Sequence, residues 1–397
     1  MKGKRILGLK FRLYSTPGRF KRTLSVFAQR LLLIVGALVL TSMVLEIAVR
    51  VVAPQQLIFL RPDIYIPSPG LGWQKAANLN TTLNTGEGEV HLYTDDKGHR
   101  VGPSKAGCES DDYKILGLGD SFAEALQVEH ESTMTARLEK GMSEMLGRRV
   151  CVKNTGVGGW DPNHYLIQAR MELQDSKYDL VVVFIYMPND VLMSRADYLP
   201  PRQPSRRYHL RLPKELSTTE FIDAWLYPVN DFLKKRSHLF IFCRIRFSTL
   251  LARVGLTAYY FPNVFMLEQA TSRMWGVTAD VCADIAMLGR QQGAKVVFLL
   301  IPGSYQIDEA EFDRYQRMFK IDPASIDLKQ PSRLLIQEFR ARGLRGLDAT
   351  EPLKTAFHSG NTRLYGDVDS HFTPAGHEVV ARYLTSVLAE RMNDEMP

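Results

Sequence analysis

Residues 111–128 read DDYKILGLGDSFAEALQV, a stretch that predicts a buried strand followed directly by a helix. The apolar run 113–118 stops at a Gly-Asp-Ser tripeptide ending in Ser121, and helix-like spacing of apolar residues follows it. Four further strands are predicted at 150–154, 179–186, 295–301 and, more weakly, 345–349. Helical patterns lie between several of them, so the sequence favours an α/β protein with a parallel, doubly wound sheet. Ligand sites in such sheets form at the carboxyl ends of the strands.

A basic segment opens the chain, with nine Lys and Arg residues and no acidic residue in residues 1–30. Subtracting these nine charges from the net charge of +7 leaves about −2 for the rest of the chain. The basic character therefore belongs to a tail, and we expect no nucleic-acid partner.

The segment 31–53 that follows predicts a transmembrane anchor. Leu31 to Leu45 carries no charge, and residues 31–52 as a helix would reach roughly 33 Å, against about 30 Å for a bilayer core. The cations before it should stay in the cytoplasm, which places the chain from residue 54 onward outside the inner membrane, in the periplasm or the extracellular space. A cleaved signal peptide is the alternative, but no clear small-residue cleavage site follows the apolar run.

The rest of the chain divides by composition. Residues 54–112 are rich in Pro, Gly, Asn and Thr, which predicts a β-rich connector, and residues 113–392 contain the strand–helix alternation of the main domain. A helical insertion is expected at 191–290, between the third and fourth strands. It opens with a basic, proline-rich stretch that could hold an acidic glycan or simply be a solvated loop.

The four cysteines are Cys108, Cys151, Cys243 and Cys282, and no CxxC motif occurs. Cys108 lies just before one predicted strand and Cys151 lies in the next, so a disulfide between them is possible outside the cytoplasm. Four separate thiols are the alternative, and a zinc ribbon is not expected.

Ser121 is predicted to lie where the first buried strand ends and a helix begins. A hydroxyl there is held near the positive helix N-terminus, and backbone N–H groups of the turn can stabilise an oxyanion. Both a nucleophile and a simple helix cap are consistent with this position.

A base for such a serine is available near the C-terminus, in the sequence DSHFTPAGH (369–377). Thr373 and Pro374 form a good helix start, so His371 should lie in the loop just before the last helix. Asp369 is close enough in sequence to orient the imidazole, as in a hydrolytic triad.

Two neighbouring residues have other expected roles. His377 falls inside the last helix, where we expect it to pack or to cap. Asp367, Asp369 and His371 alternate in sequence, which makes a metal cluster an alternative, but no fourth ligand is evident and no metal is expected.

Two more polar pieces follow the second and third strands. The stretch NTGVGGWDP (154–162) is a glycine-rich turn where backbone can approach a ligand closely. The stretch YMPND (186–190) places Asn189 just past the third strand, where its amide could donate to an oxyanion. An ordinary turn and a helix-capping pair are the alternatives, but the order of all four pieces along successive strands favours an active site.

These four blocks resemble those of the SGNH hydrolase superfamily, also called GDSL esterases and lipases, over roughly residues 113–392. The resemblance implies a flavodoxin-like three-layer α/β/α sandwich with a parallel five-stranded sheet, and no cofactor. It implies Ser121 as nucleophile, His371 as base and Asp369 as acid. The oxyanion hole would consist of the backbone N–H groups of Ser121 and Gly159 and the side chain of Asn189.

The chain departs from the family pattern at two positions. Met187 replaces the glycine that usually stands two residues before the asparagine, and Val368 stands where the last block usually has its aspartate. The Asp-x-His spacing resembles membrane-anchored and polysaccharide-modifying branches, including the alginate O-acetyltransferase type. Asp367 is the alternative acid.

Together these features predict an anchored serine esterase that removes acyl groups from an extracytoplasmic glycan or lipid, with acetyl as the favoured acyl group. An O-acetyltransferase of a cell-envelope polysaccharide would use the same triad with a sugar hydroxyl as acceptor. A non-catalytic envelope binding module is the third hypothesis.

Overall fold

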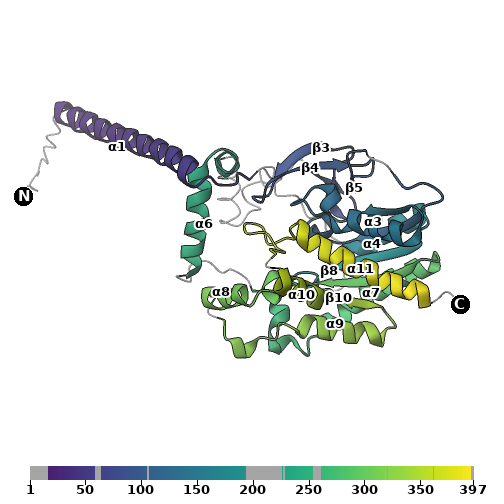
Figure 1. Cartoon of the computed structure of the whole chain (residues 1–397). Coiled ribbons are helices and arrows are strands. Elements are labelled where there is room, and N and C mark those ends of the chain that lie inside the picture. The colour runs from purple at the N-terminus through teal and green to yellow at the C-terminus, as the bar shows by residue number, and fades with distance from the viewer. Residues whose placement is uncertain are drawn as a thin grey trace, which may run out of the picture.

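The computed structural model describes residues 17–58, 64–104, 107–193, 226, 229–253, 261–319, 321–360 and 362–394. A long helix, α1 (Pro17–Val52), extends away from an α/β body that contains the strands of the described residues (Figure 1). Its segment Ala28–Val52 is long and apolar enough to cross a membrane, and none of that apolar window is buried against the body. By length and composition, α1 is therefore a candidate membrane anchor or signal sequence.

The central sheet has eight strands in the order β10-β9-β8-β6-β7-β5-β4-β3. Five of them run parallel: β6 (Tyr113–Leu118), β7 (Val150–Asn154), β8 (Leu180–Tyr186), β9 (Lys295–Ile301) and β10 (Gly346–Asp348). Numbered along the chain, these five strands lie in the order 2-1-3-4-5, which is the flavodoxin-like doubly wound order. Because right-handed crossovers place helices on both faces of such a sheet, its strands are buried on both sides.

The expectation of five strands was wrong in one respect. Antiparallel strands β5 (Arg100–Val101), β4 (Glu89–Thr94) and β3 (Asn80–Asn84) extend the sheet beyond β7, with Arg100 of β5 opposite Asn154. The segment before the first parallel strand therefore contributes to the main sheet itself. Strands β3, β4 and β5 are short and separated by turns, and their sequences do not indicate which strands they pair with.

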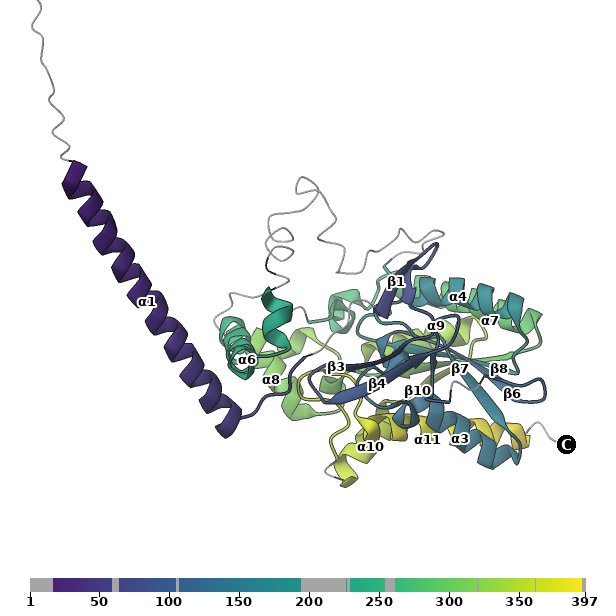
Figure 2. The same ribbon diagram turned by 90° about the horizontal axis from the view of Figure 1, so that it is seen from above.

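Helices form a layer on each face of the sheet (Figure 2). On one face lie α4 (Pro162–Asp175), α7 (Met274–Gln291) and α9 (Gln330–Ala341). On the other lie α3 (Met134–Leu146), α10 (Thr350–Gly360) and α11 (Pro374–Asp394). Alternate strand residues supply the two cores, as Leu116 and Ile115 of β6 illustrate by facing opposite layers.

The first segment after α1 also forms a separate hairpin, β1 (Tyr65–Ser68) and β2 (Gly72–Lys75). A disulfide joins Cys108 to Cys151 of β7, with 5.4 Å between the two Cα atoms. It ties the segment preceding β6 to the neighbouring strand. Of the two cysteines that remain free, Cys282 is buried and Cys243 is exposed.

The C-terminal end of α1 is bonded to α6 (His238–Arg253), a helix of the segment between β8 and β9. The Glu46 carboxylate accepts hydrogen bonds from the Ser237 hydroxyl (2.7 Å) and from the backbone N–H groups of His238 and Leu239 (both 2.9 Å). Glu46 therefore caps α6 and satisfies N–H groups that the helix leaves unpaired. Arg50 pairs with Glu46 at 2.7 Å, as its spacing of four residues permits. The basic stretch from Arg195 to Lys214, which could hold an acidic glycan or be a solvated loop, lies outside the described residues.

Candidate active site

Ser121 begins a single helical turn, α2 (Ser121–Glu124), three residues after the end of β6. The fully buried Asp120 caps this turn because its carboxylate accepts from the backbone N–H of Phe122 at 2.9 Å. The capping residue is therefore Asp120, and the hydroxyl of Ser121 remains available for chemistry. Burial raises the pKa of Asp120 to about 6.

His371 approaches this serine from a loop that ends one residue before the N-cap of α11. Its Nε2 lies 2.7 Å from the hydroxyl oxygen of Ser121. Its Nδ1 contacts the carboxylate of Asp369, and the backbone N–H of His371 donates to the Asp369 carbonyl at 2.8 Å. The ring of Phe122 lies against the imidazole, with 4.7 Å between the ring centroids. The structure thus brings Ser121 together with Asp369 and His371, although Ser121 and His371 are 250 residues apart in sequence.

The charges of the pair support a proton-accepting imidazole. Burial alone would lower the pKa of His371, but the hydrogen bond and charge of Asp369 outweigh it and raise that pKa above 6.5. Burial alone would raise the pKa of Asp369, but its hydrogen bond to His371 outweighs this, helped by one from Gln127 at 2.9 Å, and that pKa is lowered. Asp369 is held ionised and stabilises an imidazolium.

Asp367 and His377, the alternatives for the acid and the base, make other contacts. Asp367 is exposed and pairs with Arg363, so it does not take the place of Asp369 beside the imidazole. His377 is buried in α11, where its Nδ1 accepts a hydrogen bond from the first backbone N–H of α3, that of Met134, at 3.3 Å. It therefore packs and caps, as the sequence predicted.

The glycine-rich turn after β7 passes beside the serine. Gly158 approaches Ser121 closely, since a Cβ built on it would lie 3.7 Å from that of Ser121. The Gly158 N–H is already taken by the carboxylate of Glu124 at 2.9 Å. Gly159 has a φ of +78° and its N–H makes no hydrogen bond to any described residue. Of the two glycines, only Gly159 therefore retains a donor for a ligand.

Asn189 follows β8 and is exposed, and its side chain hydrogen-bonds Asp120, the residue that precedes Ser121. The neighbouring Asp190 is fully buried and accepts from the Tyr186 N–H (2.8 Å) and the Tyr165 hydroxyl (2.9 Å). Asp190 therefore fixes the loop that presents Asn189.

A buried polar network beneath the site was not anticipated from the sequence. Glu124 accepts from the Tyr65 hydroxyl at 2.8 Å and lies 3.6 Å from the ammonium of Lys75. Lys75 also donates to the carbonyl of Gly156, and Arg100 donates to the carbonyls that end α2. Tyr65, Lys75 and Arg100 all come from strands that precede the parallel sheet. Because these partners lie far apart in sequence, no local pattern indicates them.

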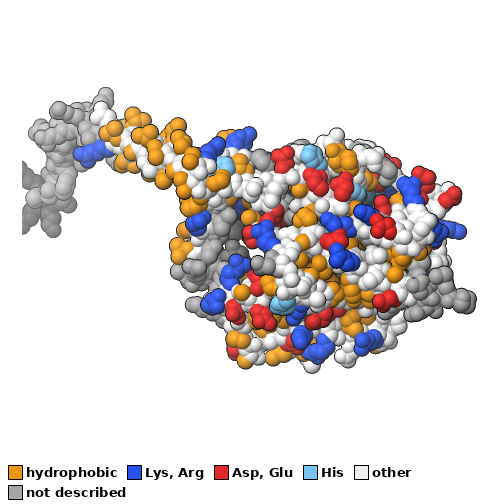
Figure 3. Space-filling view, in the orientation of Figure 1, with side chains coloured by type: hydrophobic (Ala, Val, Ile, Leu, Met, Phe, Trp, Pro, Cys, Tyr) orange, Lys and Arg blue, Asp and Glu red, His pale blue; other side chains and the backbone are white. Residues whose placement is uncertain are grey.

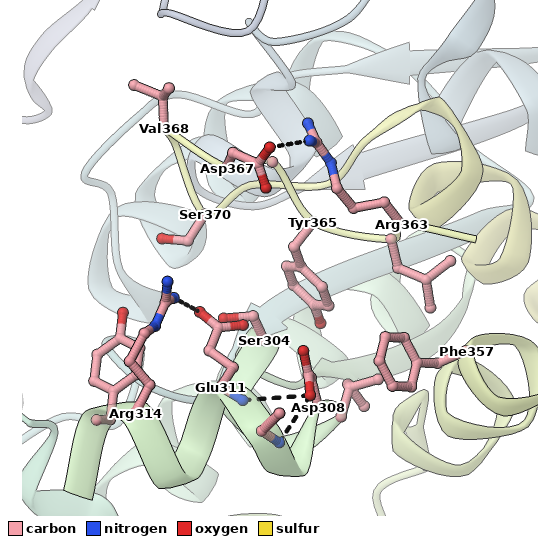
Figure 4. Close-up of a pocket in the computed structure, with 15 residues that line it drawn as sticks. Ser304, Asp308, Glu311, Arg314, Phe357, Arg363, Tyr365, Asp367, Val368 and Ser370 are labelled. Carbon is pink, nitrogen blue, oxygen red and sulfur yellow. Dashed lines mark hydrogen bonds and ion pairs between the residues drawn. The ribbon is translucent and has the colours of Figure 1, made fainter. Parts of the chain in front are cut away.

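An open cavity of about 440 Å³ is lined by the segment Arg363–Val368, by Ser370 and by residues from Ser304 to Tyr315 (Figure 4). Ser370, the residue next to His371, lines it, and α8 (Glu309–Phe319) forms another wall. Its polar lining includes Asp308, Glu311, Arg314, Arg363 and Asp367, and Tyr315 and Phe357 supply aromatic rings. The cavity thus offers both charged groups and ring faces, although none of Ser121, His371 and Asp369 lines it.

No family model matches this chain, and no curated protein matches it. Among solved structures, the crystal structure of TesA is 14% identical with a TM-score of 0.35, over 70% of this chain and 99% of that chain. A lipase/acylhydrolase from Enterococcus faecalis is 13% identical with a TM-score of 0.37, over 70% of this chain and 96% of that one. An acetyl xylan esterase, AlAXEase, is 12% identical with a TM-score of 0.37, over 69% and 98%. These likenesses are too distant to bear on the activity of this chain.

Proposed function

We propose that this protein is a membrane-anchored serine esterase of the SGNH type that hydrolyses acyl esters, acetyl esters in particular, on an extracytoplasmic glycan or lipid. One observation carries the proposal. The Ser121 hydroxyl lies 2.7 Å from Nε2 of His371, whose other ring nitrogen contacts the carboxylate of Asp369. A nucleophile, a base and a group that orients the base are the three parts that such hydrolysis needs.

In the first half of the reaction, His371 Nε2 takes the proton of Ser121 as the serine oxygen attacks the ester carbonyl. The tetrahedral oxyanion is stabilised by the N–H groups of Ser121 and Gly159 and by the amide of Asn189. When the tetrahedral adduct collapses, the imidazolium gives its proton to the departing alcohol oxygen, and the acyl group stays on Ser121. Water then attacks the acyl-serine with His371 again as base, which releases the acid and restores the serine.

The cavity lined by Ser370, the residue next to His371, supports a glycan over a lipid as the carrier of the ester. Charged side chains such as Glu311 and Arg314, together with the ring of Tyr315, suit a substrate rich in hydroxyl groups. A lipid acyl chain would instead require a mainly apolar groove.

The hydrogen bonds of Glu46 favour an uncleaved α1. Cleavage after the apolar run would remove the carboxylate that caps α6, leaving the Ser237 hydroxyl and two backbone N–H groups without their partner. With α1 in the inner membrane and its basic end in the cytoplasm, the triad faces the compartment that holds envelope glycans.

The test is hydrolysis of a chromogenic acetyl ester by the full chain in detergent micelles. Ser121→Ala and His371→Ala should each abolish the activity, and Asn189→Ala should lower kcat by about 10²–10³ through the lost oxyanion donor. Ser359→Ala and His358→Ala are matched controls because both residues are exposed at the end of α10. Activity that survives Ser121→Ala contradicts the proposal. Wild-type protein that transfers acetyl to a sugar but never to water would be a transferase.

A further inference from the structure

One face of α6 is apolar and exposed. Cys243, Phe247 and Leu250 are spaced by four and three residues, so they lie on the same side of the helix. The side chains of Phe247 and Leu250 are 60% and 53% exposed. Ile241 on the opposite side is buried at 2% and faces the body of the protein. The helix therefore turns one apolar side inward and a second apolar side outward.

The helical turn that precedes α6 has the same character. Val229 and Phe232 are 56% and 55% exposed. Cations accompany the rings, with Arg236 over Phe232 at 4.6 Å and Arg246 over Phe242 at 3.5 Å. Aromatic and aliphatic side chains interleaved with arginine are typical of helices that lie in the interface of a bilayer.

The position of α6 relative to α1 supports this reading. Glu46 and the turn around it fix the start of α6 beside the last two turns of α1, and Arg50 donates to the carbonyl of Arg236 at 2.6 Å. Figures 1 and 2 together show α6 running across the direction of α1 rather than along it. A helix held in this way at the outer end of a membrane-spanning helix lies in the plane of the membrane surface. In Figure 3, hydrophobic side chains continue from α1 onto this region.

We propose that α6 and the turn 229–234 form an interfacial element that rests in the headgroup region of the bilayer that α1 crosses. Phe232, Phe247 and Leu250 enter the boundary with the acyl chains, and Arg244 and Arg246 meet lipid phosphates. Glu46 joins this element to the anchor, so the anchor and the interfacial helix together hold the body of the protein at a set orientation to the membrane. The inference rests on the proposed anchor and is independent of the esterase chemistry.

The native chain carries a probe at the required place. Cys243 is exposed on the outward face of α6, whereas Cys282 is buried and the other two cysteines form the disulfide. Full-length protein in nanodiscs of phosphatidylethanolamine and phosphatidylglycerol is labelled at Cys243 with an environment-sensitive fluorophore. The matched control, Cys243→Ser with Ser386→Cys, places the same label on an exposed position of α11.

The label on Cys243 should show a blue-shifted emission. Lipids that carry a spin label near the headgroup should quench it more strongly than lipids that carry the spin label at the end of the acyl chain. Interfacial helices enter only about 5–10 Å into this boundary, which explains the difference. The label on α11 should respond to iodide in the water and to neither lipid. Phe247→Glu with Leu250→Glu should remove the lipid response of Cys243 without lowering the melting temperature.

Three results would overturn the inference. The first is a Cys243 label that iodide quenches as readily as the control label. The second is a Cys243 label that neither iodide nor spin-labelled lipid quenches until the protein is diluted. This result would mean that a second copy of the chain, and not the bilayer, covers α6. The third is protein that has lost residues 1–53 by intact mass and no longer binds the nanodisc. Acetyl-ester hydrolysis by the same samples tests the proposed chemistry separately.

Discussion

At the scale of single residues, the pairing of Ser121 with His371 could be predicted from the sequence because each of the two stands at a recognisable boundary. Ser121 follows a strand, and His371 precedes a helix whose start is marked by Thr373 and Pro374. The choice between Asp369 and Asp367 could not be made in this way, since both lie within reach of the imidazole along the chain. It depends on Arg363, which holds Asp367 away on the surface.

The pH dependence of catalysis distinguishes the two aspartates. His371 must be neutral to act as base, so activity is present above its pKa and is lost as pH falls through it. Because Asp369 raises that pKa above 6.5, Asp369→Asn should move the acid limb of the kcat/KM profile to lower pH and reduce its plateau. Asp367→Asn is the matched control and should leave the limb in place. If the acid limb shifts only in Asp367→Asn, then Asp367 and not Asp369 raises the pKa of His371, which contradicts the assignment made here.

At the scale of elements, the five parallel strands and the helices α3, α4, α7 and α11 were predictable from apolar runs and helix boundaries. Gly293, with a φ of +82°, stands two residues past the end of α7, where a glycine in this conformation commonly ends a helix. The addition of β3, β4 and β5 to the sheet was not predictable, because which strands pair depends on contacts distant in sequence. The same holds for the hairpin β1–β2, which supports α2 from below.

This hairpin should matter for stability through Lys75. Lys75→Met removes the cation beside the buried Glu124 carboxylate and should lower the free energy of unfolding by about 3–5 kcal/mol. Lys97→Met is the control, because Lys97 pairs with the exposed Asp175 at 2.7 Å and its loss should leave the free energy of unfolding nearly unchanged. Urea unfolding of both variants measures the difference. An equal decrease in the free energy of unfolding in the two variants would show that the buried pair of Lys75 and Glu124 stabilises the protein no more than the surface pair does.

At the scale of the whole molecule, the disulfide and the candidate membrane helix are both consistent with the proposed location outside the cytoplasm. The bond between Cys108 and Cys151 spans 43 residues of sequence, and it was one of two readings that the cysteine positions allowed. Only the approach of the two segments across β6 and β7 decides between them.

Reduction of this disulfide should lower the free energy of unfolding by about 2–5 kcal/mol, since the reduced unfolded chain gains conformational freedom. Thermal unfolding with and without dithiothreitol measures the effect. With or without dithiothreitol, Cys108→Ser should melt at the temperature of the reduced wild-type protein, whereas Cys243→Ser should behave as wild type. A melting temperature that ignores the reductant would mean that the bond does not contribute to stability.

The central claim is that Ser121 is an activated nucleophile, and covalent trapping tests it most directly. Full-length protein is treated with a fluorophosphonate, which reacts with serines activated by a neighbouring base, and the adduct is mapped by peptide mass spectrometry. The account predicts a single modified peptide that contains Ser121, and little or no labelling in His371→Ala. An unlabelled wild-type protein, or an adduct on any other serine, would contradict it.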